Sequence, residues 1–232
     1  MSPVAALSSI QDQLDKLGRA DTKIIVVTKT HGPEIIDTLL QSGHRDFGEN
    51  RFQEARAKFA LVAKAQTKPV YHHIGPLQSG FARNLPGLFQ YVHGVSSLSA
   101  LQVLHKAAQK HFSQTQNPTK YLMQLNLTGE TSKLGGMTKQ QFEDCLPQLA
   151  NDDSLQWVGF MTIGPTDQNL QKTREVFQQL RKIKDEFLPD GELSMGMSAD
   201  WQIAVDEGAT MIRIGTAITG SRKGAPWSAE SG

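Results

Sequence analysis

The sequence predicts an α/β fold, a single (β/α)8 barrel of the TIM type with an extra helix at its N-terminus. Short apolar segments, several of them rich in Val and Ile, alternate with helical patterns, and eight such segments can be counted. The length of 232 residues is close to that of a minimal barrel. No stretch has the composition of a linker, so we expect one domain over residues 1–232. A doubly wound open sheet gives the same alternation and stays the alternative.

The extra helix is expected to begin at Ser2 and Pro3, which suit a cap and a first helical position, and to end at Gly18. The predicted strands span residues 24–28, 45–47, 70–74, 91–95, 121–127, 157–163, 193–195 and 211–214. The predicted helices span residues 33–41, 51–65, 79–84, 98–110, 139–150, 170–186 and 198–207. The tail 221–232 contains Gly, Ser and Pro and is expected to be flexible.

Composition points away from several classes of protein. A net charge of +1 favours neither nucleic acid nor a membrane surface as a partner. The longest strongly apolar run, residues 24–27, is far too short to span a bilayer, and the N-terminus does not have the pattern of a signal peptide. We therefore expect a cytoplasmic protein. The single cysteine, Cys145, excludes an intrachain disulfide, and its apolar neighbours predict a buried, inert thiol on a helix face.

Lys29 is the most informative residue at a predicted strand end, because functional groups of β/α-barrels gather at the carboxyl ends of the strands. It follows the segment Ile-Ile-Val-Val-Thr. Partial desolvation at the barrel mouth would lower the pKa of its amine, as an imine-forming lysine requires. On position alone, a lysine that extends from the strand end into solvent is the favoured interpretation.

Two further segments predict an anion site, and this favours a functional role for Lys29 over a lysine that only extends into solvent. Ser198 suits the cap of the helix predicted at 198–207, and Gly215 and Thr216 follow the last strand with small residues. Phosphate binding by the loops after the seventh and eighth strands recurs in this fold. For Ser198, simple helix capping is an equal alternative, and either half alone is a weak indication. Arg213, between two isoleucines on the last strand, needs either a ligand or a carboxylate partner.

Other candidates are weaker. His72 and His73 are adjacent on a strand, but no other histidine or cysteine has matching metal-ligand spacing, so we expect packing and no metal site. The loop from Ser132 to Gly136 has the composition of a mobile, anion-binding loop but matches no phosphate-loop signature.

Taken in order, six segments resemble one known family, the pyridoxal phosphate homeostasis proteins, whose fold is similar to the barrel domain of bacterial alanine racemase. The segments are VVTKT (26–30), DFGENRFQE (46–54), HIGPLQS (73–79), GFMTIGP (159–165), LSMGMSAD (193–200) and MIRIGTAITG (211–220). The resemblance implies that the cofactor is pyridoxal 5′-phosphate (PLP), held as a Schiff base. The resemblance implies that Lys29 forms the Schiff base and that the phosphate is held by Ser198, Gly215 and Thr216. It also implies that Arg213 faces the pyridine nitrogen and that Asn50 lies near the ring or its phenolic oxygen.

The chain departs from the family pattern at three places. Trp-His-Phe of the family is Tyr-His-His at 71–73, Asn-Lys is Gly-Phe at 80–81, and His-Ser-Val-Asp-Ser is His-Gly-Val-Ser-Ser at 93–97. The segments expected to contact the cofactor are intact, so these changes bear on contacts with partners or substrates.

The function expected from these residues is a non-catalytic carrier that stores, buffers or delivers PLP in the cell, with apo-enzymes as its recipients. An arginine facing the pyridine nitrogen weakens the ring as an electron sink. Racemisation also needs a second base, which alanine racemase takes from a C-terminal domain, and Tyr71, Tyr91 and Tyr121 all lie on predicted strands. A PLP-dependent amino-acid racemase and a barrel enzyme for a sugar phosphate are the alternatives. Without the second domain, we expect a monomer.

Overall fold

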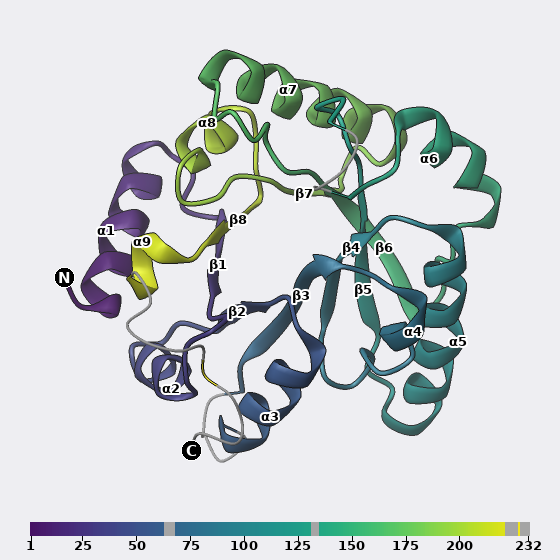
Figure 1. The fold of residues 1–232 in the computed structure, drawn as a ribbon, viewed down its shortest axis with the longest axis horizontal. Coiled ribbons are helices and arrows are strands. Elements are labelled where there is room, and N and C mark those ends of the chain that lie inside the picture. Colours follow the sequence, from purple (N-terminus) through teal and green to yellow (C-terminus); the bar gives the residue numbers. More distant parts are fainter. Residues whose placement is uncertain (63–67, 131–134, 221–226, 228–232) are drawn as a thin grey trace.

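Eight parallel strands close into a barrel with helices on its outside, as the sequence predicts (Figure 1). The computed structural model describes residues 1–62, 68–130, 135–220 and 227. Each strand pairs with the next along the chain, and β1 also pairs with β8, so the sheet has no free edge. The open doubly wound sheet is therefore wrong.

The strands are β1 (Lys23–Val27), β2 (Asp46–Glu49), β3 (Val70–Pro76), β4 (Tyr91–Val95), β5 (Thr119–Gln124), β6 (Leu155–Met161), β7 (Glu192–Ser194) and β8 (Met211–Ile214). All eight overlap the predicted segments, and β4 and β8 have the predicted bounds. The polar second strand begins one residue later and ends two residues later than expected. Strands β5 and β6 begin and end earlier than expected, because the residues after them lead into loops at the barrel mouth.

The α-helices are α1 (Pro3–Lys16), α2 (Glu34–Gln41), α3 (Phe52–Val62), α4 (Ser79–Ala82), α5 (Leu98–Thr115), α6 (Lys139–Cys145), α7 (Leu170–Phe187), α8 (Trp201–Asp206) and α9 (Thr216–Thr219). A short 3-10 helix, Leu146–Gln148, continues α6. The expected extra helix is α1, whose N-cap Ser2 accepts a hydrogen bond from the backbone N–H of Ala5. Helix α9 has no counterpart in the sequence-based expectation, and it packs against α1.

The apolar core has two parts, because alternate residues of each strand face opposite sides of the sheet. The larger part lies between barrel and helices and includes Ile24, Val26, Ile212 and Ile214. A small apolar cluster of Ile25, Tyr91, Leu122, Met161 and Met211 fills part of the barrel interior. The rest of the interior is polar, which is uncommon for this fold.

Cys145 ends α6 and packs against the core, but it is partly buried rather than buried, and desolvation raises the pKa of its thiol. The tail 221–232 lies outside the described residues except for Trp227. Among the helices of the described part, none is long and apolar enough to cross a membrane.

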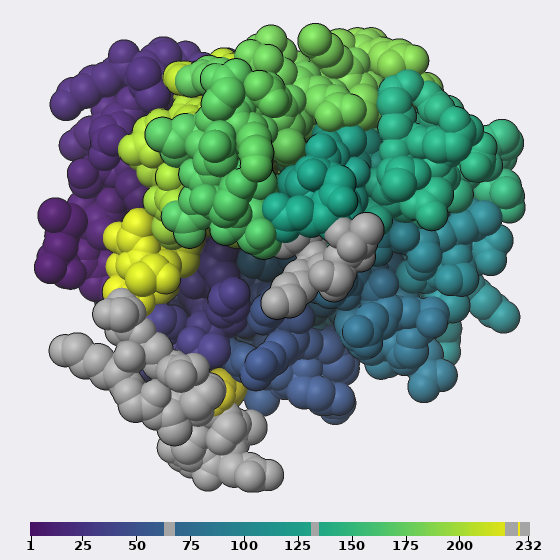
Figure 2. All heavy atoms as spheres, turned by 45° about the horizontal axis from the view of Figure 1, so that its top comes forward, coloured from purple at the N-terminus to yellow at the C-terminus, as the bar shows by residue number. Residues whose placement is uncertain are grey.

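Seen as spheres, the mouth of the barrel is hollowed between α9 and the segments after β2 and β3 (Figure 2).

Candidate functional site

The predicted site residues lie at the carboxyl ends of four neighbouring strands. Since β7 pairs with β8, β8 with β1 and β1 with β2, these ends form one continuous arc of the barrel mouth. Ser198 lies four residues after β7, Arg213 in β8, Gly215 and Thr216 directly after β8, Lys29 two residues after β1, and Asn50 directly after β2. Residues distant in the sequence are thus brought to one side of the mouth.

Lys29 lies in a turn after β1, and its side chain is exposed. The expected partial desolvation of its amine is therefore wrong, because a turn carries the residue beyond the buried strand. The exposure leaves the Lys29 amine accessible from the barrel mouth.

A buried ion cluster holds the residue just before Lys29. The fully buried Lys58 amine on α3 donates to Glu49 Oε1 at 2.6 Å and to the carbonyl oxygen of Thr28 at 2.8 Å. The Thr28 hydroxyl donates to the same Glu49 oxygen at 2.7 Å. Burial raises the pKa of the Glu49 carboxyl, although Lys58 and Thr28 act against that shift. The cluster fixes the end of β1.

The residue after Lys29 is fixed as well. Thr30 has a φ of 68°, a left-handed conformation that β-branched residues rarely adopt. Its N–H donates to Glu54 Oε1 at 2.5 Å, and its carbonyl accepts from the N–H of Trp227 at 3.2 Å. Glu54 also pairs with Lys58 at 3.2 Å. Both neighbours of Lys29 are thus tied to one buried cluster.

The reasoning from sequence did not single out this cluster. Glu49 and Glu54 fall inside the second family segment, but no role was assigned to them. The available signal was the i,i+4 spacing of Glu54 and Lys58 on a predicted helix, with Lys58 between the buried Ala55 and Phe59.

Arg213 points into the barrel interior and is 4% exposed. It donates to Ser194 Oγ at 2.7 Å and to the carbonyl oxygen of Thr162 at 3.0 Å. Desolvation lowers the pKa of its guanidinium to about 10, with Asp200 opposing that shift, so it stays charged at neutral pH. No carboxylate of the described residues pairs with it directly, and the two bonds use two of its five N–H donors. A hydrogen-bond acceptor in the mouth fits the remaining donors.

The loop after β7 differs from the expectation in detail. Helix α8 begins at Trp201, and the residue at its N-cap is Asp200, so Ser198 is not the helix cap. Asp200 Oδ1 accepts from the N–H of Met197 at 2.5 Å, which folds the loop on itself. Gly196 has a φ of 90°, and a Cβ atom there would lie 2.6 Å from the Cβ of Ala204. The loop needs this glycine, whose carbonyl oxygen accepts from the N–H of Arg213 at 2.9 Å.

Gly215 and Thr216 form the turn from β8 into α9. Gly215 takes the N-cap position, without a side-chain cap, and Thr216 is the exposed first residue of the helix. Small residues therefore follow β8, next to the loop of Ser198. The two predicted halves of the anion site are neighbours at the mouth.

Asn50 closes the other end of the arc. Its Oδ1 is buried and has no hydrogen-bond partner among the described residues. Gly75 on β3 packs directly against it, since a Cβ there would lie 2.7 Å from the carbonyl oxygen of Asn50. A buried acceptor without a donor is unfavourable by about 1–3 kcal/mol, unless a bound molecule supplies that donor. Asn50 thus offers an unused acceptor, and Arg213 offers unused donors, to a bound molecule.

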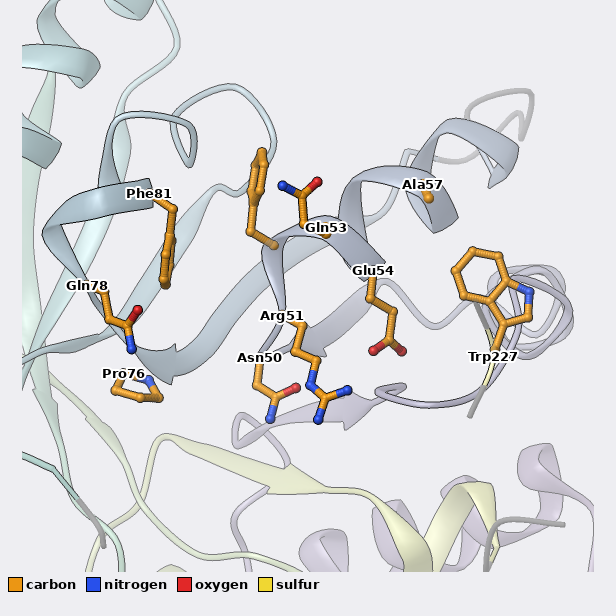
Figure 3. Close-up of a pocket in the computed structure, with 10 residues that line it drawn as sticks. Asn50, Arg51, Gln53, Glu54, Ala57, Pro76, Gln78, Phe81 and Trp227 are labelled. Atoms are coloured by element: carbon orange, nitrogen blue, oxygen red, sulfur yellow. The ribbon is translucent and has the colours of Figure 1, made fainter. Parts of the chain in front are cut away.

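A cavity of about 690 Å³ opens beside Asn50, between α3 and α4. Asn50, Arg51 and Glu54 lie side by side in it, with Gln78 and Phe81 on one flank and Trp227 on the other (Figure 3). Its volume is in the range that holds a small organic molecule.

The two histidines that were weaker candidates lie inside the fold. His72 and His73 are both fully buried. No group of three His, Cys, Asp or Glu residues in the described chain could hold a metal ion. Most of the loop from Ser132 to Gly136 lies outside the described residues. Gly136 is described and has a φ of 103°. It packs closely on Asn126, because a Cβ atom at Gly136 would lie 2.7 Å from the backbone nitrogen of Asn126.

Comparison with known proteins decides the family. The model of the alanine racemase N-terminal domain matches residues 5–223. Pyridoxal phosphate homeostasis proteins of Aquifex aeolicus and Pseudomonas aeruginosa are 31% and 35% identical, each over 94% of this chain and over 95% and 93% of their own. The chain belongs to the pyridoxal phosphate homeostasis protein family.

Solved structures agree with this family. PipY of Synechococcus elongatus, in a structure with PLP bound, is 32% identical and superposes with a TM-score of 0.82 over 94% of this chain and 99% of that chain. An alanine racemase of Clostridium difficile, 15% identical with a TM-score of 0.71, shares the fold over 96% of this chain but only 57% of its own.

Proposed function

We propose that this chain is a PLP carrier of the homeostasis family, which holds the cofactor reversibly as a Schiff base on Lys29 and serves its storage, buffering or delivery. The observation that carries the proposal is the arc of Lys29, Asn50, Arg213 and the Ser198 and Gly215–Thr216 loops over four neighbouring strands. PLP bound to PipY, a relative with the same fold, supports the same cofactor here.

Each part of the arc has one task in this proposal. Bound PLP would supply an aldehyde that reacts reversibly with amines. Lys29 provides the amine, and its position is fixed through Thr28 and Thr30. Arg213, a donor with no acceptor function, would donate to an unprotonated pyridine nitrogen. The loops of Ser198 and Gly215–Thr216 offer hydroxyl and backbone N–H groups to the phosphate. Asn50 accepts from, or donates to, a ring substituent.

The exposure of Lys29 favours a carrier. Handing the cofactor on would require a second amine to reach the site, and the exposed position of Lys29 would admit that amine. A racemase instead needs two bases on opposite faces of a substrate in a closed site. We therefore infer that Lys29 acts as an exchangeable tether.

The tyrosines do not favour the racemase. Tyr71 stacks on Phe59 with ring centroids 3.4 Å apart, and the Tyr121 hydroxyl donates to the carbonyl oxygen of Ala150 at 2.7 Å. Tyr91 stacks on His72 inside the barrel. Each tyrosine is engaged away from the arc. Delivery to apo-enzymes, a monomeric state and a cytoplasmic location complete the proposal and stay predictions.

The test combines spectroscopy with isotope exchange. Purified apo-protein is titrated with PLP, and Lys29→Ala is compared with Lys120→Ala, a lysine on β5 outside the arc. We expect the visible band of a Schiff base in wild type and Lys120→Ala, and no such band in Lys29→Ala. A band that persists in Lys29→Ala would refute the tether.

The second arm separates carrier from enzyme. Holo-protein is incubated with L-amino acids in deuterium oxide, and the α-hydrogen is followed by NMR. We expect exchange no faster than with free PLP. Exchange over many turnovers would overturn the carrier in favour of the racemase.

A further inference from the structure

A continuous chain of hydrogen bonds runs through the barrel interior from Arg213 to the opposite, amino-terminal end. Ser194 Oγ lies 2.7 Å from the Arg213 guanidinium and 2.8 Å from His93 Nδ1. His93 Nε2 lies 2.9 Å from His72 Nδ1, and His72 Nε2 lies 3.0 Å from Asp46 Oδ1.

These five residues come from five strands, β2, β3, β4, β7 and β8. Arg213, Ser194, His93 and His72 are buried, whereas the Asp46 side chain is 26% exposed at the start of β2. The chain of bonds therefore connects the candidate cofactor site to a carboxylate near solvent at the other end of the barrel. Apolar residues fill this space in most barrels, and polar groups are unfavourable there unless each is hydrogen-bonded.

With both imidazoles neutral, the chemistry of the two ends fixes the direction of every bond. A guanidinium only donates, and a carboxylate only accepts. Ser194 accepts from Arg213 and donates to His93 Nδ1, His93 donates through Nε2 to His72 Nδ1, and His72 donates through Nε2 to Asp46. Ser194, His93 and His72 then each donate one hydrogen and accept one, and each imidazole carries its proton on Nε2.

The electrostatic surroundings agree with neutral rings. Desolvation lowers the pKa of both His72 and His93, and Arg213 lowers that of His93 further. Burial favours a raised pKa for Asp46, but the hydrogen bond from His72 and the nearby charges outweigh it and hold that pKa below its usual value. A metal is not needed to explain the histidines, because their facing nitrogens bond each other.

Hydrogen bonds that point one way polarise one another. Because the Asp46 carboxylate accepts the last hydrogen bond of the series, it strengthens the bonds that His72, His93 and Ser194 donate. The Ser194 oxygen thereby becomes more negative and a better acceptor for Arg213. The carbonyl oxygen of Thr162 holds the second terminal nitrogen of Arg213 at 3.0 Å. The two acceptors fix the plane of the guanidinium, and with it the direction of the donors left for a ligand.

We propose that Asp46, His72, His93 and Ser194 form a positioning relay that orients Arg213 and balances its charge from the far end of the barrel. This inference rests on the proposed function for the identity of the ligand that Arg213 meets. Asp46 touches no ligand in this scheme and acts only through the relay.

The first test needs no cofactor. In apo-protein labelled with ¹⁵N in histidine, NMR reports the tautomer and charge of each ring. We expect His72 and His93 to be neutral with the proton on Nε2. Asp46→Leu removes the terminal acceptor, so the tautomer of His72 is expected to change. A charged ring, or an Nδ1 tautomer, in wild type would overturn the assigned direction.

The second test measures the ligand side. PLP affinity and the pH midpoint of the visible band are compared among wild type, Ser194→Ala and Asp46→Asn, which keeps the shape of the side chain but removes its charge. We expect roughly a two- to tenfold loss of affinity, the size of one lost hydrogen bond, and a displaced midpoint in both variants. His73→Phe, on the same strand but outside the relay, is the matched control and is expected to leave both quantities unchanged.

The outcomes are distinguishable. If wild type shows no Schiff base, the proposed function fails, while the NMR result still decides the relay. If wild type binds PLP and Asp46→Asn matches it in affinity and midpoint, the relay is overturned and the carrier stands. Should Ser194→Ala not fold, the test is made with Asp46→Asn, because the Asp46 side chain is partly exposed.

Discussion

His73 offers a sharp test of the energetics of this barrel. It lies on β3 with both ring nitrogens buried and without a hydrogen-bond partner in the described structure. The rings of Phe81 and Phe89 surround it at centroid distances of 5.8 and 5.3 Å. Unsatisfied buried polar groups destabilise a fold by about 1–3 kcal/mol. His73→Phe, which restores the aromatic residue of the family pattern, is therefore expected to raise the free energy of unfolding by about that amount, or roughly 2–12 °C in Tm.

The same substitution has a predicted pH dependence. Desolvation lowers the pKa of His73 from 6.5 to about 4, so the unfolded chain takes up a proton at a higher pH than the folded protein. Wild type thus loses stability as pH falls from about 7 to about 4, up to roughly 3.4 kcal/mol for this group. Between about pH 7.5 and about pH 5.5, the advantage of His73→Phe is expected to grow by about 1.4 kcal/mol.

Urea unfolding of the apo-protein, followed by circular dichroism at both pH values, measures these differences. His72→Phe is the matched control, because the nitrogens of His72 bond Asp46 and His93. We expect that variant to be less stable than wild type. The reasoning is refuted if His73→Phe is less stable at neutral pH, or if its advantage is the same at both pH values.

Two further substitutions test the loops around the site. Lys58→Met leaves buried carboxylates without their cation, and we expect a loss of about 3–5 kcal/mol in urea unfolding together with weaker PLP binding in a spectroscopic titration. Unchanged PLP affinity would show that the cluster does not position Lys29. Gly196→Ala places a Cβ 2.6 Å from Ala204 at a φ of 90°, so we expect about 1–3 kcal/mol lower stability and weaker binding of the phosphate. Wild-type values for both would contradict the need for glycine.

Most helices and strands of the barrel were predictable, because each depends on a pattern of residues within its own segment. Most strands lie in short apolar segments, and α5 and α7 repeat their apolar residues at helical spacing. Helix α9 was missed because four residues carry no periodicity. Ser198 was wrongly expected to cap α8, since Asp200, two residues later, competes for the same position.

The site was predictable in its residues but not in its environment. Strand ends placed Lys29, Asn50 and Arg213 at one mouth, because parallel strands all end on the same side. The exposure of Lys29 depends on the turn after β1, and the partners of Arg213 lie on other strands, so neither can be derived from a local pattern. The same holds for the relay, whose residues are far apart in the sequence.

The most direct test of the central claim is to locate the covalent bond. Holo-protein is treated with borohydride, which reduces a Schiff base to a stable secondary amine, and is then digested and analysed by mass spectrometry. We expect the reduced cofactor on the peptide that contains Lys29, and on no other lysine at stoichiometric amounts of PLP. Modification of a different lysine, or no modification of a protein that binds PLP, would contradict the assignment of Lys29 as the tether.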